Sequence, residues 1–173
     1  METDKYSEDL TEILVRQATG AGLLHGVLLS SPDIDDAWAG YSASFYGDAV
    51  HNFNEYPEFC LACAGYLGMA VAHLWDQDWQ QYKDCPYSFF MGPRGFDDMD
   101  DHITGSILHE GEKSIAAMES CSSAAKHFLI KSGAEPGTAE AYRLFLKSVA
   151  VMYRIGASIE LSRLGYRLQE ASL

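Results

Sequence analysis

The sequence predicts an all-α protein: a single-domain, multihelical bundle of six or seven helices that spans residues 1–173. Two observations predict this fold class. First, apolar residues recur at helical spacing, in segments bounded by residues that are typical of helix starts and ends. Second, no segment of useful length alternates apolar with polar residues as a β-strand does. A chain of this length buries roughly 70% of its unfolded surface, and its 47% of hydrophobic residues can form a core without disulfides or metals.

The first two helices are predicted from apolar spacing and capping. The first is expected to run from about Tyr6 to Leu29, with its apolar residues on one face. Ser31 is a typical N-cap for the second helix, Pro32 suits the first helical position, and Asp33 places an acid in the first turn.

The third predicted helix begins at Pro57 and contains the most apolar stretch of the chain. Phe59 to Trp75 is 17 residues long, and His73 is its only ionisable residue apart from cysteine and tyrosine. That length is at the short limit for a membrane span, the flanking residues are acidic, and Ala, Gly and Cys are frequent. We therefore interpret it as a buried central helix and expect no membrane association; a short helix is expected to continue from Asp78 to Lys83.

Small residues recur every four positions along this third helix, at Cys60, Ala64, Gly68 and Ala72. Such a row allows another helix to approach closely. The last predicted helix has a matching apolar line that includes Gly156 and is therefore a candidate partner, while ordinary core packing is the favoured interpretation of the row.

The second half of the chain is predicted to hold a loop and three more helices. Residues 85–96 contain two prolines and two glycines, which indicates a loop. Asp97 is expected to cap a helix that ends near Gly111, and another should cover Glu112 to Ser132. Thr138 is expected to cap the last helix, which ends at Gly165.

The charge of the chain excludes two classes of partner. With 12 Lys and Arg against 25 Asp and Glu, the formal charge is −13, so we expect binding neither to nucleic acid nor to an anionic membrane. The acids are concentrated in residues 1–110, whereas residues 111–173 carry 8 basic and 6 acidic residues. The weakly basic residues 111–173 could pack beside the acidic residues 1–110 of the same chain, or beside those of a second copy in a homodimer.

The N-terminal residues lack the basic and apolar regions of a signal peptide, so a cytoplasmic location with reduced cysteines is expected. Cys60 and Cys63 form a Cys-x-x-Cys spacing on the predicted third helix. Buried, inert thiols are the favoured interpretation, while a metal pair or a redox pair stays open.

Acid–histidine pairs at helical spacing form the sharpest chemical pattern. Three such pairs stand on three predicted helices, and side chains that point inward from facing helices build metal sites in bundles. A site of this kind could hold zinc, manganese or iron and activate water for hydrolysis. Its candidate ligands are His51, His73, Asp76, Asp98 and His102. The alternative is that the acids stabilise helix starts and the histidines belong to the core.

The loop at residues 85–96 suggests a second type of site. An aromatic pocket with one arginine could bind a small anionic ligand. The candidate residues are Arg94, Tyr87, Phe90 and Trp79. Alternatively, the aromatic residues anchor the loop or face a partner, and Arg94 pairs with the acids that follow it.

Two segments carry a resemblance: residues 55–69, EYPEFCLACAGYLGM, and residues 152–160, MYRIGASIE. They resemble an all-helical family of Bacteroidetes-type bacterial proteins that has no assigned activity. The resemblance implies an all-α fold and a bacterial cytoplasmic setting, and it supplies no catalytic residues.

Three functional hypotheses follow from the sequence. The favoured one is a non-enzymatic interaction or scaffold protein, with a protein partner or a second copy of itself. The alternatives are a hydrolase-type metal enzyme that uses the acid–histidine pairs and a small-anion binder that uses the aromatic loop.

Overall fold

The computed structural model describes residues 4–51, 57–108 and 112–167. These residues contain six α-helices and no β-strand, which confirms the predicted all-α bundle. The α-helices are α1 (Lys5–Gly20), α2 (Pro32–Val50), α3 (Pro57–Tyr82), α4 (Met99–His102), α5 (Glu112–Lys131) and α6 (Ala139–Arg163). Two short 3₁₀-helices, η1 (Tyr87–Phe90) and η2 (Phe96–Asp98), and one π-helix, η3 (Ile103–Ile107), complete the described structure.

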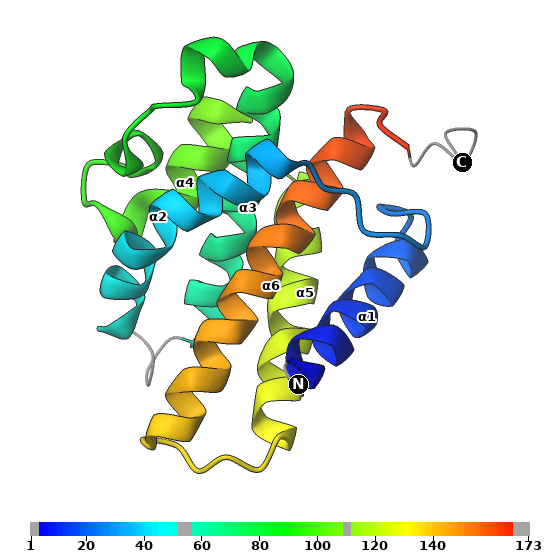
Figure 1. Ribbon diagram of the computed structural model, residues 1–173, viewed down its shortest axis with the longest axis vertical. Helices are drawn as coiled ribbons and strands as arrows, with labels where there is room; N and C mark the ends of the chain where they lie inside the picture. Colours follow the sequence, from blue (N-terminus) through cyan, green and yellow to red (C-terminus); the bar gives the residue numbers. More distant parts are fainter. Residues whose placement is uncertain (1–3, 52–56, 109–111, 168–173) are drawn as a thin grey trace.

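Helices α3 and α6 form the centre of the bundle. Every residue from Cys60 to Ala72 is buried, and α6 packs along α3 over much of its length. Helix α5 lies beside both, and α1 covers one side of the α5–α6 pair (Figure 1). Helix α3 is long and apolar enough to cross a membrane, but 78% of its apolar stretch is buried inside the bundle, as expected for a core helix.

Glycines permit the close approach of α3 and α6 that the small-residue row predicted. A Cβ atom on Gly68 would collide with the carbonyl oxygen of Tyr153, and one on Gly156 would collide with that of Gly65. Because both obstacles are backbone atoms, neither helix could accommodate a larger residue without moving apart. These glycines therefore set the distance between the two central helices.

The predicted helix starts are confirmed at two caps. The Ser31 side chain accepts a hydrogen bond from the backbone N–H of Asp33 at 3.2 Å, and Thr138 accepts one from Ala141 at 3.2 Å. Such caps satisfy N–H groups that have no partner inside the helix.

Helix α1 ends earlier than predicted. It stops at Gly20 rather than near Leu29, and Gly22 follows with a left-handed φ of 82°. The backbone N–H of Leu23 then bonds back to the carbonyl of Ala18, which turns the chain away from the helix axis. The connection to α2 passes over α6, where the N–H of Leu29 donates to the Ser158 hydroxyl.

The segment predicted as one helix from Asp97 is instead three short pieces. η2, α4 and η3 follow one another, and Asp97 caps none of them through its side chain. The Thr104 hydroxyl bonds to the carbonyl of Asp100, a contact that favours bending of a helix. The predicted end near Gly111 lies outside the described residues.

Candidate functional site

Four of the five predicted metal ligands, Asp76, Asp98, His73 and His102, are engaged in separate contacts. His51 is the exposed C-cap residue of α2, and Asp76 accepts a hydrogen bond from the Tyr166 hydroxyl at 2.7 Å. His102 lies 3.0 Å from the carbonyl oxygen of Phe89. Among the residues that the structure describes, no group of three His, Cys, Asp or Glu side chains could hold a metal ion, so His51, His73, Asp76, Asp98 and His102 are not brought together.

Asp98 binds Arg94, as the alternative interpretation of these residues expected. The guanidinium Nε and Nη2 atoms lie 2.9 and 2.6 Å from Asp98 Oδ1, and the Arg94 backbone N–H donates to Oδ2 at 2.8 Å. The hydrogen bonds from Arg94 lower the pKa of Asp98 below its ordinary value. The charge of Arg94 is therefore already paired with a carboxylate of its own loop.

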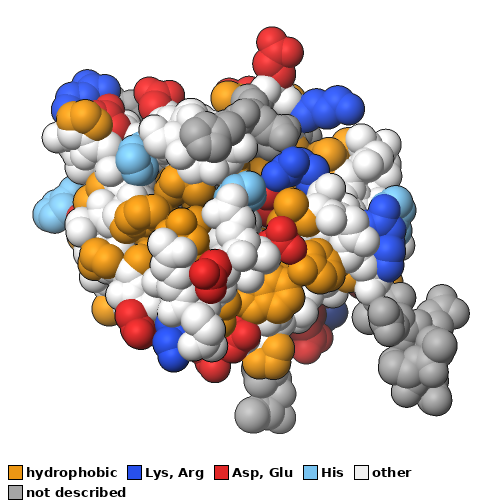
Figure 2. All heavy atoms as spheres, turned by 90° about the horizontal axis from the view of Figure 1, so that it is seen from above, with side chains coloured by type: hydrophobic (Ala, Val, Ile, Leu, Met, Phe, Trp, Pro, Cys, Tyr) orange, Lys and Arg blue, Asp and Glu red, His pale blue; other side chains and the backbone are white. Residues whose placement is uncertain are grey.

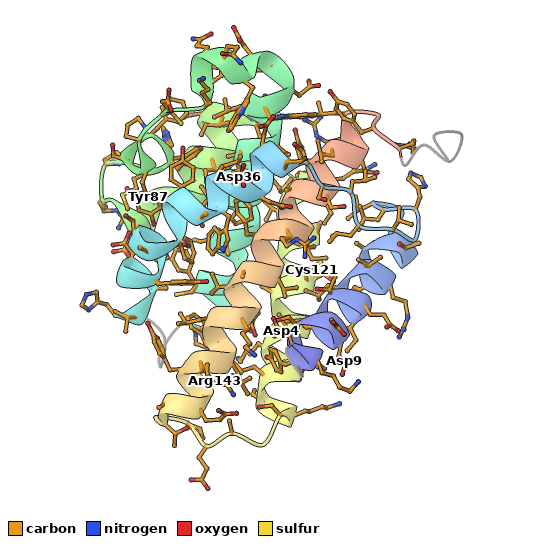
Figure 3. The ribbon with its side chains drawn as sticks, viewed as in Figure 1. Asp4, Asp9, Asp36, Tyr87, Cys121 and Arg143 are labelled. Carbon is orange, nitrogen blue, oxygen red and sulfur yellow. The ribbon has the colours of Figure 1, made fainter. Side chains whose placement is uncertain are left out.

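The aromatic residues of the loop pack against the bundle. Phe90 is fully buried, 5.3 Å from the ring of Tyr41, and the Tyr87 hydroxyl donates to Asp48 of α2 at 3.0 Å (Figure 3). Trp79 lines a hollow of about 260 Å³ together with three aspartates and one lysine. Arg94 does not line that hollow and its wall is acidic, so this hollow does not combine Trp79 with Arg94 as the predicted anion pocket requires.

The cysteines match the buried, inert interpretation. Cys60, Cys63 and Cys121 are buried, and none of the four cysteines forms a disulfide. Burial raises the pKa of Cys60 to about 12 and that of Cys121 to about 11. At neutral pH these side chains are thiols rather than the thiolates that react or bind metals.

A buried carboxylate between α3 and α6 is the polar feature that the sequence patterns missed. Glu160 has no solvent exposure, yet its oxygens bond to Arg163 at 2.8 and 2.5 Å and to His73 Nδ1 at 2.9 Å. His73 Nε2 in turn lies 3.1 Å from the side-chain amide of Gln77. The signal available in the sequence was a single acid within the otherwise uncharged run at residues 155–162.

A wide groove lies between α1 and α6, and we call it the α1–α6 groove. Its volume is about 1030 Å³. It is lined by Asp4, Ser7, Glu8, Thr11, Glu12, Val15, Arg16, Thr19, Gly20, Gly26, Leu28, Ala150, Val151 and Arg154. The sequence-based hypotheses did not single out this surface, because it combines side chains from two helices far apart in the chain.

Charged side chains border this groove along α1. Asp4, Glu8 and Glu12 follow one another at four-residue spacing and end at Arg16. Asp4, which lies at the end of α1 that meets α6, pairs with Lys147 at 3.0 Å (Figure 3). Glu12 pairs with Arg16 at 2.8 Å, whereas Glu8 is exposed and has no ion-pair partner within the described part of the chain.

The comparisons with known proteins leave the chain without a relative that could assign a function. No protein-family model, no curated protein and no solved structure matches it. The resemblance to a Bacteroidetes-type family therefore stays a prediction, and a functional proposal has to come from the geometry.

Proposed function

We propose that this chain is a non-enzymatic protein-interaction module, and that its α1–α6 groove holds an amphipathic helix with a basic face. The observation that supports this proposal is the groove itself, with its short side chains along the floor and its acidic edge. Because the metal candidates make separate contacts, the proposal involves no catalytic centre.

The shape of the groove suits a helix. The residues of α1 that line it extend from Asp4 to Gly20, about 24 Å at 1.5 Å per residue. Half-buried short side chains from both helices line it, including Thr11 and Val15 of α1 and Ala150 of α6. A third helix laid along the α1–α6 pair would bury apolar surface from several turns at once, which is the usual mode of helix-in-groove recognition.

The charge of the edge favours a basic partner over a second copy of the chain. Three of the four charged side chains on the α1 edge are acidic, and Glu8 is available to a lysine or arginine of the partner. Two copies that met through this edge would bring like charges together, in molecules that each carry a formal charge of −13. A partner helix with a basic face has the complementary charge.

Fluorescence anisotropy tests the proposal with defined probes. One probe is a labelled helical peptide of about 16 residues, matched to the length of α1, with Leu on one face and Lys on the other. The second probe has Glu in place of Lys. We expect the Leu/Lys peptide to bind more tightly than the Leu/Glu peptide.

Two matched variants locate the binding. Val15→Arg fills the groove with a bulky cation, and Ile130→Arg makes the same change at an exposed residue of α5 outside it. We expect Val15→Arg to weaken Leu/Lys binding by about tenfold or more and Ile130→Arg to leave it unchanged. Equal binding of the two peptides, or equal effects of the two variants, would contradict the proposal. So would a stable dimer in sedimentation that Val15→Arg dissociates, because a second copy would then occupy the groove.

A further inference from the structure

A second hollow lies at the end of the bundle where α6 finishes, and its character is opposite to that of the groove. It has a volume of about 470 Å³. The end of α6, the start of α5 and the connection after α1 form its walls. We call it the basic pocket; its lining residues are Gly22, Leu23, His25, Lys113, Ile159, Ser162, Arg163 and Arg167.

The pocket gathers cations in an acidic molecule. Lys113, Arg163 and Arg167 supply three of the chain's 12 Lys and Arg residues, and His25 adds a titratable group. Among the described residues, no Asp or Glu lines this pocket. Figure 2 shows this end of the molecule, with Lys, Arg and His side chains spaced among exposed hydrophobic ones. Glu160 balances the charge of Arg163, while no described Asp or Glu pairs with Lys113 or Arg167, so an anion bound between these two cations would relieve their mutual repulsion.

Helix C-termini account for only part of this charge. Arg163 stands in the last turn of α6, and Arg167, four residues beyond it, donates to the carbonyl of Ser162 in that turn, where the helix dipole favours cations. Lys113 has the opposite position, in the first turn of α5, where the dipole disfavours a cation. The position of Lys113 therefore does not stabilise α5, so helix stability does not explain why a cation lies at this pocket.

Internal contacts fix the two arginines. The buried Glu160 carboxylate holds Arg163 through two hydrogen bonds, and Arg167 Nη1 donates to the carbonyls of Ser162 and Tyr166 at 3.2 and 2.7 Å. Glu160 is held in turn by His73. Arginines that are ordered before a ligand arrives lose less side-chain entropy on binding, so the pocket is preorganised.

We propose that the basic pocket binds a small organic anion that carries at least two negative charges, as a phosphate ester or a polycarboxylate does. Lys113 and Arg167 match such a charge, since Glu160 already balances Arg163, and Leu23 and Ile159 offer an apolar wall to its carbon skeleton. The volume lies within the usual range of small-molecule sites, roughly 300–1,000 Å³. This site is separate from the α1–α6 groove and does not depend on the function proposed for it.

Calorimetric titration of the whole chain at low ionic strength tests the site, because salt screens exposed charges. The probes are inorganic pyrophosphate, citrate and acetate. We expect saturable one-to-one binding of pyrophosphate, citrate or both, and much weaker binding of acetate. The tighter of the two multivalent probes distinguishes a phosphate ligand from a carboxylate ligand.

A pair of lysine variants provides the control. Lys113→Met removes a pocket cation, and Lys131→Met makes the same change at the far end of α5. Both positions are exposed, so both variants should fold. We expect Lys113→Met to lower the affinity for the tighter multivalent probe by about tenfold or more, which is the effect of losing one charged hydrogen bond. Lys131→Met should leave that affinity unchanged. The proposal is overturned if neither multivalent probe binds saturably, or if both variants weaken binding equally.

Discussion

The α1–α6 groove and the basic pocket use different parts of one helix and are built in different ways. Near its middle, α6 contributes Ala150 and Arg154 to an open groove whose charged residues, apart from Glu8, make ion pairs at the surface. The basic pocket instead uses Arg163 at the end of α6 and Arg167 just beyond it, and internal contacts hold both. We propose that the groove adapts to a partner helix and that the pocket is fixed for one kind of ligand. The shapes of the groove and of the pocket both depend on the position of α6, which is set by its packing against α3.

The largest effect is expected where α3 and α6 touch. Gly156→Ala places a Cβ atom against the backbone of Gly65, which cannot yield without separating the helices. We expect a loss of about 3 kcal/mol or more in the free energy of unfolding, measured by urea denaturation. Gly40→Ala is the matched control, because a Cβ atom at that position in α2 meets nothing. It should stabilise the protein by about 0.5 kcal/mol, and equal effects of the two variants would refute this view of the helix contact.

The ion pair between the buried Glu160 and the partly exposed Arg163 should have the next largest effect. Arg163→Met leaves the Glu160 carboxylate without this cation, and because water reaches the Arg163 side chain we expect a loss of about 2 kcal/mol, less than for a fully buried pair. Adding Glu160→Gln should recover part of that loss, because no charge then stays buried.

The exposed pair Glu140 and Arg143 has the same spacing on the same helix and supplies the comparison. Arg143→Met should change the free energy of unfolding by less than about 0.5 kcal/mol. If Arg163→Met and Arg143→Met lower the free energy of unfolding by similar amounts in urea titrations, the burial of Glu160 does not make its ion pair stronger than the exposed pair.

Charge reversal on the edge of the groove should act on one surface only. Glu8→Lys is expected to weaken binding of the Leu/Lys peptide about fivefold, because it replaces attraction with repulsion. Glu135→Lys, in the exposed connection before α6, makes the same change in net charge and should have little effect. Neither variant should alter the affinity of the basic pocket for pyrophosphate by more than about twofold. An equal effect of both variants on peptide binding would mean that net charge alone drives it.

The smallest effect is expected at Asp98, because most of the Arg94 side chain is exposed. The pKa of Asp98 is lower in the folded chain than its ordinary value of 3.8. The ionised Asp98 carboxylate therefore contributes fully to the free energy of unfolding at pH values above its ordinary pKa. This contribution is lost as the pH falls through the lower pKa of the folded chain. Asp98→Asn should be less stable than the wild type at pH 7, and the difference should shrink below about pH 4 in urea titrations. Asp97→Asn, at the exposed neighbouring position, is the control, and a difference that does not depend on pH would contradict the assignment.

The sequence predicted local structure best where the signal lay in neighbouring residues. Ser31 and Thr138 identify helix starts because a cap acts over three residues. The small-residue row around Gly68 identified the contact with α6, since a periodic pattern reports a helix face. By contrast, the repeated aspartates after Phe96 favoured one helix, but the structure forms three short pieces there.

The functional surfaces were not predictable in the same way. The groove and the basic pocket combine residues that are distant in the sequence, such as Val15 with Val151 and His25 with Lys113. Glu160 is the single acid in the otherwise uncharged run at residues 155–162, but that run alone does not show that its side chain is buried. Which face of α6 is covered depends on the packing of α3 and α5, and no pattern within α6 alone could show it.

The most direct test of two separate recognition surfaces is amide chemical-shift mapping of ¹⁵N-labelled protein. We predict that the Leu/Lys peptide shifts signals from Ser7 to Thr19 and around Val151, and leaves Lys113 and Arg167 unchanged. Pyrophosphate should do the reverse, with the largest shifts at Lys113, Leu23 and Arg167. Overlapping shifts from the two probes, or peptide shifts centred on residues 85–96, would contradict the division of the surface into a groove for a basic helix and a pocket for an anion.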